Sequence, residues 1–297
     1  MAEGYPRDTS QQRVYRALEA LVAGEDSSID LTQAVLLIAS TEYPDLDMAQ
    51  YMTQLDALAR RVRVVLALPP GEQENQLPPE IDPLVVISAL NKVLFEEEGF
   101  HGNQEDYYNP HNSLLNKVLE ERTGIPITLS LLYMEVGRRV GIAMEGIALP
   151  FHFVVGCRLP QGMIYIDPFN GGQLLSQRDC RDLIRRIAKA RIKMHPQWFE
   201  PVSRKQILIR VLNNLKNIYI DKEDFARALT ICDLLVLLTP HDFGERRDRG
   251  VIHLQLKHYA HALHDLTAYI ENTPHASDRY EILNYIKTIR NIMAMMN

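Results

Sequence analysis

The chain has 297 residues, of which 46% are hydrophobic and 24% are charged, as in an ordinary water-soluble globular protein. Its net charge of -6 argues against general binding to nucleic acids or to membrane surfaces. The N-terminus lacks the apolar segment of a secretory signal, and no apolar run is long enough to span a membrane. Three cysteines without a CxxC pair suit a reducing compartment, so we expect a cytoplasmic protein.

The first part of the chain, residues 1–83, is predicted to be a helical region. Apolar residues recur at spacings of three and four within residues 10–68, which is the pattern of amphipathic helices. Asp30 is placed to cap the second of these helices. Residues 69–83 are rich in proline and polar residues and are expected to form a loop.

Three further helices are predicted in the middle region, residues 84–200. The first follows the proline-rich loop, and the second would be capped by Asn112 or Ser113 and ended by Gly124. The third begins at Pro126 and is apolar nearly all round in its first turns. A helix of that kind is expected to be buried rather than to lie on the surface.

A β-hairpin is predicted over residues 143–167, with the turn sequence Pro-Gln-Gly at 160–162. His152 falls on the first strand, and Asp167 closes the second. Counting outward from the turn brings Asp167 within about two residues of the position opposite His152, a diagonal that side chains can bridge. The pattern therefore predicts a contact between the two side chains.

A basic helix is predicted after the hairpin, over residues 177–193. Ser176 followed by Asp179 is the pattern of a capping box, which would begin this helix. Its basic residues are Arg178, Arg181, Arg185, Arg186, Lys189, Arg191 and Lys193. On an acidic chain they could bind an anionic partner, although such a run is more often a solvated helix face.

The last region, residues 201–297, contains an internal repeat with a period of 34 residues. The sequence Thr-Pro-His at 239–241 recurs at 273–275, and Ala228 corresponds to Ala262. This period, with small residues where paired helices cross, is the signature of tetratricopeptide repeats. We expect two repeats followed by a capping helix.

Tetratricopeptide repeats leave a concave groove, because their helix pairs stack side by side. We expect this groove to bind a protein or a peptide. Tyr219 and Tyr259 lie at repeat positions and are candidate binding residues.

The predicted contact between His152 and Asp167 supplies two of the three parts of nucleophilic catalysis, a base and the carboxylate that orients it. The third part would lie at the N-terminus of the preceding helix, where free N–H groups and the helix dipole lower the pKa of a thiol. That position is Pro126, which has no nucleophilic atom. Proline suits the first position of a helix, since its fixed φ is already helical.

The order of these features resembles the transglutaminase-like, papain-related core, in which a helix opens Gly-x-Cys and a His and an Asp follow on strands. Here residues 124–126 read Gly-Ile-Pro, so that Pro126 stands where the family has its cysteine. Val140 and Gly141 match a Leu-Gly-like pair near the end of the family's helix. Residues 94–133 and the sequence DPFNGG look like the SirB-type bacterial proteins, which fuse this core to tetratricopeptide repeats.

The resemblance implies an α+β fold that is mostly helical. A papain/transglutaminase-like core with a small antiparallel sheet would occupy residues 84–200, and α-helical repeats would follow. The resemblance implies no cofactor. Four histidines lie close together in the repeat region, at His253, His258, His261 and His264. No carboxylate or cysteine completes a familiar ligand spacing around them, so we expect no metal.

Other side chains could replace the missing thiol. Ser130 shares the helix face of Pro126 one turn deeper, and Thr128 lies on a different face. With His152 and Asp167, either hydroxyl would make a hydrolase or an acyl transferase.

A cysteine outside this helix is a second kind of candidate. Cys180 falls in the first turn of the basic helix beside Arg178 and Arg181, a setting that favours a thiolate. A free cysteine more often behaves as a small hydrophobic residue, and we favour that interpretation.

The favoured hypothesis is a non-catalytic scaffold for protein interaction or regulation. His152 and Asp167 would be retained without turnover. Asn170 would be a binding residue that lines the cleft in which the related enzymes have their active site. A protein or peptide partner would bind to the cleft or to the groove of the repeats, and the sequence shows no element that reads DNA. The alternative is the hydrolase or acyl transferase that uses Ser130 or Thr128.

Overall fold

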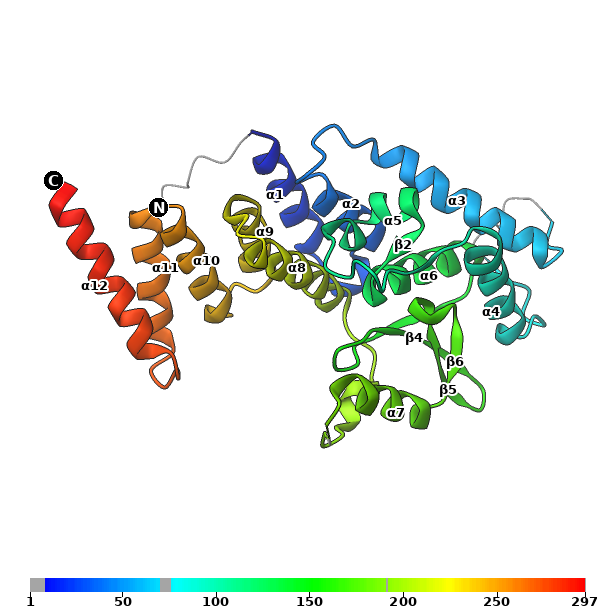
Figure 1. The fold of residues 1–297 in the computed structure, drawn as a ribbon. Helices are drawn as coiled ribbons and strands as arrows, with labels where there is room; N and C mark the ends of the chain where they lie inside the picture. The colour runs from blue at the N-terminus through cyan, green and yellow to red at the C-terminus, as the bar shows by residue number, and fades with distance from the viewer. Residues whose placement is uncertain (1–8, 70–75, 191, 297) are drawn as a thin grey trace. The chain divides into compact units, whose positions relative to one another are not determined.

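The computed structural model describes residues 9–69, 76–190 and 192–296 (Figure 1). By contacts between residues the chain divides into two compact units. Residues 25–211 form the core unit, and residues 9–24 join residues 212–296 in the repeat unit. None of the helices in the described ranges combines the length and the apolar character that crossing a membrane requires. The division into three regions with boundaries at 83 and 200 stays a prediction.

Six α-helices of the described chain lie within the core unit. They are α2 (Leu31–Ala39), α3 (Met48–Val65), α4 (Pro83–Asn91), α5 (Leu115–Glu121), α6 (Pro126–Val140) and α7 (Gln177–Ala188). The helix α4 continues as a π-helix, η2 (Lys92–Glu97). Asp30 caps α2 as predicted, since its carboxylate accepts a hydrogen bond of 2.9 Å from the Gln33 N–H. The fold is α+β and mainly helical, as the sequence predicts.

Helix α6 is buried along almost its whole length, which confirms the prediction from its apolar sequence. Pro126 occupies its first position, and Gly141 ends it with a φ of 111°. The carboxylate of Glu135 is buried inside the unit and accepts hydrogen bonds from Thr32 (2.6 Å) and Arg139 (2.8 Å). Burial of this charge is therefore compensated by pairing.

The start of α5 differs from the prediction. Asn112 and Ser113 belong to the 3₁₀-helix η3 (Pro110–Ser113), and Leu114 occupies the cap position of α5. The Asn112 amide is already engaged, because it donates to the carbonyls of Asp106 (2.7 Å) and Tyr107 (3.2 Å).

The end of α5 also differs. The helix ends before Gly124, because Arg122 adopts a left-handed conformation with a φ of 60°. Gly124 lies instead in β2 (Thr123–Gly124), which pairs in parallel with β1 (His101–Gly102).

A four-stranded antiparallel sheet has the order β3-β4-β5-β6. Its strands are β3 (Glu145–Ile147), β4 (Val154–Leu159), β5 (Gly162–Asp167) and β6 (Gln173–Leu175). Leu159 pairs with Gly162, so β4 and β5 form the predicted hairpin with a two-residue loop.

The prediction of one strand up to that turn was wrong. Residues 148–153 lie outside any strand, and His152 precedes β4. Pro150 cannot donate a ladder hydrogen bond, and Phe151 has a φ of 63°, so the strand is interrupted here.

One face of the sheet packs against α7 through a hydrophobic cluster. Its buried members are Ile147, Leu149, Val154, Tyr165, Leu175, Cys180, Ile184 and Phe199. The capping box that begins α7 is confirmed by hydrogen bonds from Ser176 N to Asp179 Oδ2 (2.8 Å) and from Asp179 N to Ser176 Oγ (3.2 Å). The helix ends at Ala188 rather than at 193, because Lys189 adopts a left-handed conformation.

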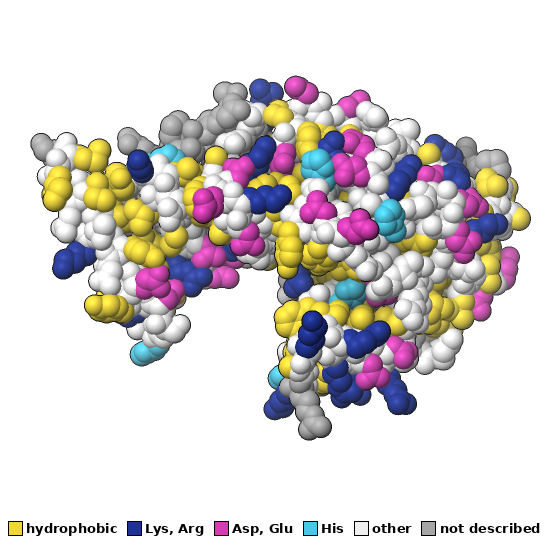
Figure 2. Space-filling model, viewed as in Figure 1, with side chains coloured by type: hydrophobic (Ala, Val, Ile, Leu, Met, Phe, Trp, Pro, Cys, Tyr) yellow, Lys and Arg dark blue, Asp and Glu magenta, His cyan; other side chains and the backbone are white. Residues whose placement is uncertain are grey.

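The basic side chains of α7 lie on its exposed side. Figure 2 shows dark blue side chains gathered over the part of the core unit where Figure 1 places α7. Arg178, Arg181, Arg185 and Arg186 are all exposed. Arg191 lies outside the described residues. The arrangement is that of a solvated helix face.

The repeat unit is made of helices. They are α1 (Thr9–Val22), α8 (Arg204–Asp221), which begins in the core unit, α9 (Phe225–Leu238), α10 (Phe243–Gln255), α11 (Tyr259–Asn272) and α12 (Arg279–Met296). The 34-residue period is confirmed, because α9 and α11 begin and end at positions 34 apart. Ala228 and Ala262 are fully buried, and a Cβ at Gly250 would lie 2.9 Å from Leu266. Small residues therefore permit the close helix crossings.

The N-terminal helix α1 contacts the first repeat. Gln11 Nε2 donates a hydrogen bond of 3.1 Å to Thr230 Oγ1 on α9. The sequence separation of these residues is more than 200 positions, so the periodic pattern of the repeats does not reveal this contact.

Candidate functional site

The His152 and Asp167 side chains meet as the hairpin register predicts. Val155 pairs with Ile166, so the position opposite Asp167 is Val154, two residues from His152. His152 Nε2 lies 2.9 Å from Asp167 Oδ2. The two side chains are 5% and 1% exposed. The contact is thus a buried base held by a carboxylate.

Asp167 also holds the turn that follows β5. Its Oδ2 accepts a hydrogen bond of 2.7 Å from the Asn170 side-chain amide, and its Oδ1 accepts one of 3.4 Å from the Asn170 N–H. The carboxylate therefore caps η4 (Pro168–Asn170) as well as orienting His152. Asn170, a predicted lining residue, is exposed and bonded to Asp167.

Hydrogen bonds connect Gly172, at the end of this turn, to Asn91 on α4 and through it to Tyr133 on α6. The Gly172 carbonyl accepts a hydrogen bond of 2.9 Å from Asn91 Nδ2, and Asn91 Oδ1 accepts one of 2.9 Å from the Tyr133 hydroxyl. Gly172 has a φ of 76°, and a Cβ there would overlap the Asn91 amide. Sequence reasoning missed Asn91 and Tyr133. The sequence did carry a signal for Asn91, which is a polar side chain at the end of the apolar helix α4.

The start of α6 offers no side-chain nucleophile at Pro126. Thr128 Oγ1 accepts from the Ile125 N–H (3.2 Å) and donates to the Asn112 carbonyl (2.6 Å). Ser130 Oγ donates to the Phe153 carbonyl at 3.4 Å. Within the described ranges, the hydrogen bonds of both hydroxyls thus run to the backbone and not to His152.

A row of aromatic rings covers His152 and continues to the surface. Phe169 meets the His152 ring edge to face at 5.9 Å, Tyr107 meets Phe169 at 6.2 Å, and Tyr108 meets Tyr107 at 5.4 Å. Tyr108 is 69% exposed, and Phe151 beside His152 is 59% exposed. Exposed aromatic side chains therefore occur at Tyr108, at the outer end of this row, and at Phe151, the chain neighbour of His152.

The cysteines are poor candidates for a nucleophile. Cys157, Cys180 and Cys232 are all buried and free. Burial, followed by the charge of Asp167, raises the pKa of Cys180 to about 12. Cys180 is fully buried, which agrees with the favoured interpretation of a small hydrophobic residue and not with a reactive thiolate.

No group of His, Cys, Asp and Glu side chains in the described residues is arranged to hold a metal ion. His253, His258 and His261 lie together in the repeat unit, with ring centroids 5.2–6.4 Å apart. Tyr219 is 2% exposed, so it packs inside the first repeat, and Tyr259 is half-buried at the start of α11. Their role in binding stays a prediction.

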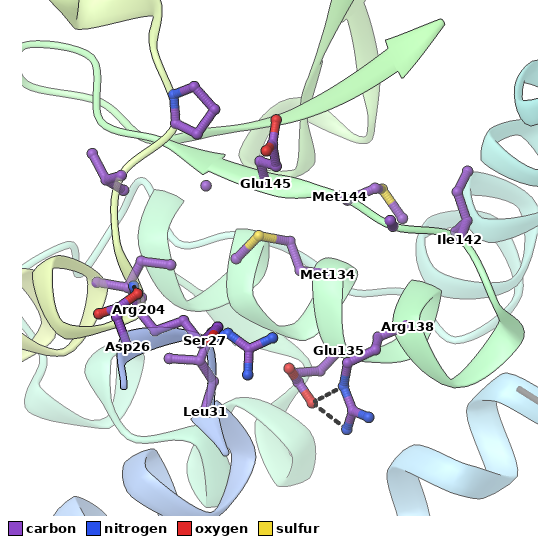
Figure 3. A pocket seen from close by; sticks show the side chains of 15 residues that line it. Asp26, Ser27, Leu31, Met134, Glu135, Arg138, Ile142, Met144, Glu145 and Arg204 are labelled. Carbon is purple, nitrogen blue, oxygen red and sulfur yellow. Dashed lines mark hydrogen bonds and ion pairs between the residues drawn. The ribbon is translucent and has the colours of Figure 1, made fainter. Parts of the chain in front are cut away.

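Two cavities in the core unit lie away from His152. The first, of about 350 Å³, is formed by α6, β3 and residues 201–207 (Figure 3). Met134 and Met144 supply apolar lining, and Arg138 is held by Glu135 at 3.0 Å. The second, of about 440 Å³, adjoins α3 and α5. Neither cavity has His152 or Asp167 in its lining.

Comparison with known proteins identifies both parts of the chain. Residues 49–213 match the transglutaminase-like superfamily, and residues 215–287 match a tetratricopeptide repeat family. A UPF0162 protein of Xylella fastidiosa strain 9a5c is 34% identical over 86% of this chain and 88% of its own length.

Two further relatives share the match. A UPF0162 protein of Vibrio cholerae is 31% identical over 68% of this chain and 75% of that protein. F-box only protein 21 of Homo sapiens is 29% identical over 69% of this chain but only 35% of that protein. The chain belongs to the transglutaminase-like superfamily, in the family of the UPF0162 proteins, and carries tetratricopeptide repeats after its core.

Proposed function

We propose that the chain is a non-catalytic scaffold for protein interaction or regulation. Its transglutaminase-like core would lack a nucleophile, and both the core and the repeats would bind protein or peptide partners. The observation that carries the proposal is Pro126 at the first position of α6, with the Thr128 and Ser130 hydroxyls bonded to the backbone. A base without a nucleophile in reach cannot begin acyl transfer.

The retained His152 and Asp167 have a structural task in this proposal. Asp167 joins His152 to the Asn170 turn through three hydrogen bonds. Buried polar groups persist when each has a partner, whether or not they take part in a reaction.

Two surfaces support a binding role. Tyr108 and Phe151 in the core unit each expose an aromatic ring, and aromatic residues are enriched at protein interfaces. The repeat unit stacks helix pairs, a geometry that commonly binds peptides and helices. A segment similar to this chain also spans 35% of the human F-box only protein 21, which fits a module that works beside other domains.

The resemblance to SirB-type bacterial proteins adds a regulatory setting to the same proposal, and a cytoplasmic location goes with it. The competing function is a hydrolase or acyl transferase that uses Ser130 or Thr128 with His152 and Asp167. A shift of α6 relative to the hairpin would be needed for either hydroxyl to reach His152, because both are held by backbone carbonyls.

An activity measurement separates the two functions. Ester hydrolysis and amine incorporation are followed with the purified chain and with His152→Ala, Ser130→Ala and Thr128→Val. We expect the same background rate for all four proteins. A rate in the unchanged chain that His152→Ala and one hydroxyl variant both abolish would establish the enzyme and overturn the scaffold.

A binding measurement tests the scaffold directly. Partners captured from cells are cross-linked to the unchanged chain and to a double variant, Tyr108→Ala with Phe151→Ala, which removes only exposed side chains. We expect the double variant to lose core-unit cross-links. Val64→Ala is the matched control, because Val64 is an exposed apolar residue elsewhere in the core unit. Equal cross-linking by all three proteins would remove both exposed aromatic residues from the proposal.

A further inference from the structure

Helix α7 of the core unit presents a basic face to the solvent. The face consists of the four arginines of the helix and the lysine that follows it, which are Arg178, Arg181, Arg185, Arg186 and Lys189. All five side chains are exposed, and Figure 2 shows dark blue side chains gathered over α7. With 3.6 residues per turn, the four arginines fall within about 140° of the helix circumference. They therefore lie on one side of α7.

The opposite side of α7 keeps this basic face turned outward. Cys180 and Ile184 are fully buried in the cluster between the helix and the sheet. The capping box of Ser176 and Asp179 fixes the position at which the helix begins. Turning the arginines inward would expose this apolar side and bury their charges, and both changes cost free energy. The basic face is therefore held in the orientation in which a partner can contact it.

Most of the charge on the basic face has no partner within the chain. In the described residues only Arg185 of the five cations forms an ion pair, with Asp182 at 2.9 Å. That pair is exposed, and exposed pairs contribute little to stability. The other acid of the helix, Asp179, accepts its hydrogen bonds from Ser176. The N–H donors of the face are thus left to the solvent or to a ligand.

Two arginines of the basic face are held in place by their neighbours. The Arg181 guanidinium lies over the Phe199 ring, 5.6 Å from its centroid, and Phe199 itself is buried. The Asp182 carboxylate accepts a hydrogen bond of 2.9 Å from the Arg185 side chain. A side chain that is ordered before binding loses less conformational entropy when a partner binds. The basic face is therefore partly ordered before any partner binds.

The distribution of charge along the chain selects the class of partner. Residues 177–193 contain seven basic residues against two acidic ones, although the whole chain has a net charge of -6. The rest of the chain is therefore more acidic than the net charge indicates, and it would repel a broad polyanion such as a nucleic acid or an anionic membrane. A narrow acidic element that contacts α7 alone avoids this repulsion while it pairs with the arginines.

The spacing of the arginines selects the form of that element. Arg178, Arg181 and Arg185 are three and four residues apart and span about 10 Å along the helix axis. Neighbours at these spacings lie about 5–6 Å apart. A second helix with glutamates at spacings of three and four places its carboxylates at the same intervals. Each guanidinium can then bind a carboxylate through two parallel hydrogen bonds.

We propose that the basic face of α7 binds an acidic helix of a partner protein. The partner helix would carry a row of carboxylates along one side and lie along α7, where the guanidinium groups donate hydrogen bonds to those carboxylates. This inference rests on the proposed scaffold function for the presence of a partner. It adds the place at which the partner binds and the chemistry by which it is recognised.

The test uses designed peptides, so it does not depend on knowing the partner. Two fluorescent, alanine-rich peptides have the same length and the same number of glutamates. In the first peptide the glutamates follow one side of the helix at spacings of three and four, and in the second they are spread around it. Fluorescence anisotropy measures binding to the full chain, and we expect the first peptide to bind at least about tenfold more tightly. Equal affinities would show only diffuse attraction and overturn the proposal.

Two double variants locate the site. Arg178→Glu with Arg185→Glu reverses two charges of the basic face and changes only exposed side chains, so circular dichroism should show an unchanged fold. We expect it to bind the first peptide at least about tenfold more weakly than the unchanged chain does. Arg60→Glu with Lys92→Glu makes the same change in net charge at exposed positions of α3 and η2, and this matched control should keep the affinity. Equal affinities of the two double variants would mean that α7 is not the site.

Other anions give the remaining outcomes. Tighter binding of the chain to vesicles of phosphatidylcholine with phosphatidylserine, or to a short single-stranded oligodeoxynucleotide, than to the first peptide would overturn the choice of an acidic helix. Esterase activity in the chain would remove the scaffold but leave peptide binding to be observed, and absence of peptide binding would leave the scaffold intact. The two proposals can therefore fail separately.

Discussion

At the scale of single residues, the His152 site shows that a catalytic geometry can persist without its chemistry. The 2.9 Å contact between His152 and Asp167 is the one that a nucleophile would need. Yet Asp167 also caps the turn that contains Asn170, so selection for a stable fold alone can maintain it. Removing the carboxylate should then affect stability rather than turnover.

Asp167→Asn tests this role with a side chain of the same shape. The amide keeps one acceptor but loses the charge that strengthens the bonds from His152 and Asn170. We expect a loss of about 1–2 kcal/mol in the free energy of unfolding, measured by urea titration. Asp182→Asn is the control, because Asp182 forms an exposed ion pair with Arg185, and its effect should stay below about 0.5 kcal/mol. If Asp167→Asn and Asp182→Asn lowered the free energy of unfolding by the same amount, Asp167 would have no special structural role.

Adjacent glycines allow the strain of a left-handed backbone to be separated from a steric clash. Gly171 and Gly172 have φ values of 68° and 76°, but only at Gly172 would a Cβ overlap a neighbour, the Asn91 amide. Gly171→Ala should therefore cost about 1 kcal/mol and Gly172→Ala at least about 3 kcal/mol, both by urea titration. Similar costs at the two positions would mean that the bond from Asn91 does not fix the turn.

At the scale of elements, the features that depend on local sequence patterns could be predicted, whereas contacts between distant residues could not. The burial of α6 follows from its apolar sequence, and the diagonal contact of His152 follows from a two-residue turn. The break between β3 and β4 was missed, because Pro150 was counted within a continuous strand. The bond from Asn91 to Gly172 joins residues 81 positions apart, and no local pattern encodes it.

Helix α7 shows the same limit, because its start and its arginines left a reactive thiol as the alternative for Cys180, and the burial that supports the favoured unreactive side chain is visible only in the fold. Burial raises the pKa of Cys180 to about 12 and also raises the pKa of Cys157. In the native chain at pH 8 we expect iodoacetamide to leave all three cysteines unmodified, as measured by mass spectrometry of the intact protein. The same chain unfolded in urea is the control and should gain three adducts. Rapid native labelling of Cys180 alone would restore it as a nucleophile.

At the scale of the whole molecule, the two units have different kinds of interior. In the core unit the buried carboxylate of Glu135 forms its ion pairs with Arg138 and Arg139 of its own helix, α6, whereas the repeat unit carries a series of ion pairs between helices. Lys216 on α8 reaches Glu245 (2.7 Å) and Asp248 (2.8 Å) on α10, and Arg249 on α10 reaches Asp265 (2.6 Å) on α11. The 34-residue period predicts the helices but not these pairs, because the charges do not repeat with it.

A buried histidine near these ion pairs should make the repeat unit sensitive to mild acid. Burial lowers the pKa of His253 to about 4, with the charge of Arg249 adding to the effect and that of Asp265 opposing it. The unfolded chain therefore binds a proton between pH 6.5 and about 4 that the folded chain does not. Stability from this group is complete above the unfolded pKa and is lost as the pH falls through that window.

Between pH 7 and pH 5, His253 should remove about 2 kcal/mol from the stability of the repeat unit. Amide hydrogen exchange of peptides within residues 225–272 measures this loss, after correction for the intrinsic effect of pH on exchange. His253→Gln should flatten the pH dependence, because glutamine does not titrate. His264→Gln replaces an exposed histidine of the same unit and should leave the dependence unchanged. A loss of protection that persists in His253→Gln would assign the acid sensitivity to the ion pairs instead.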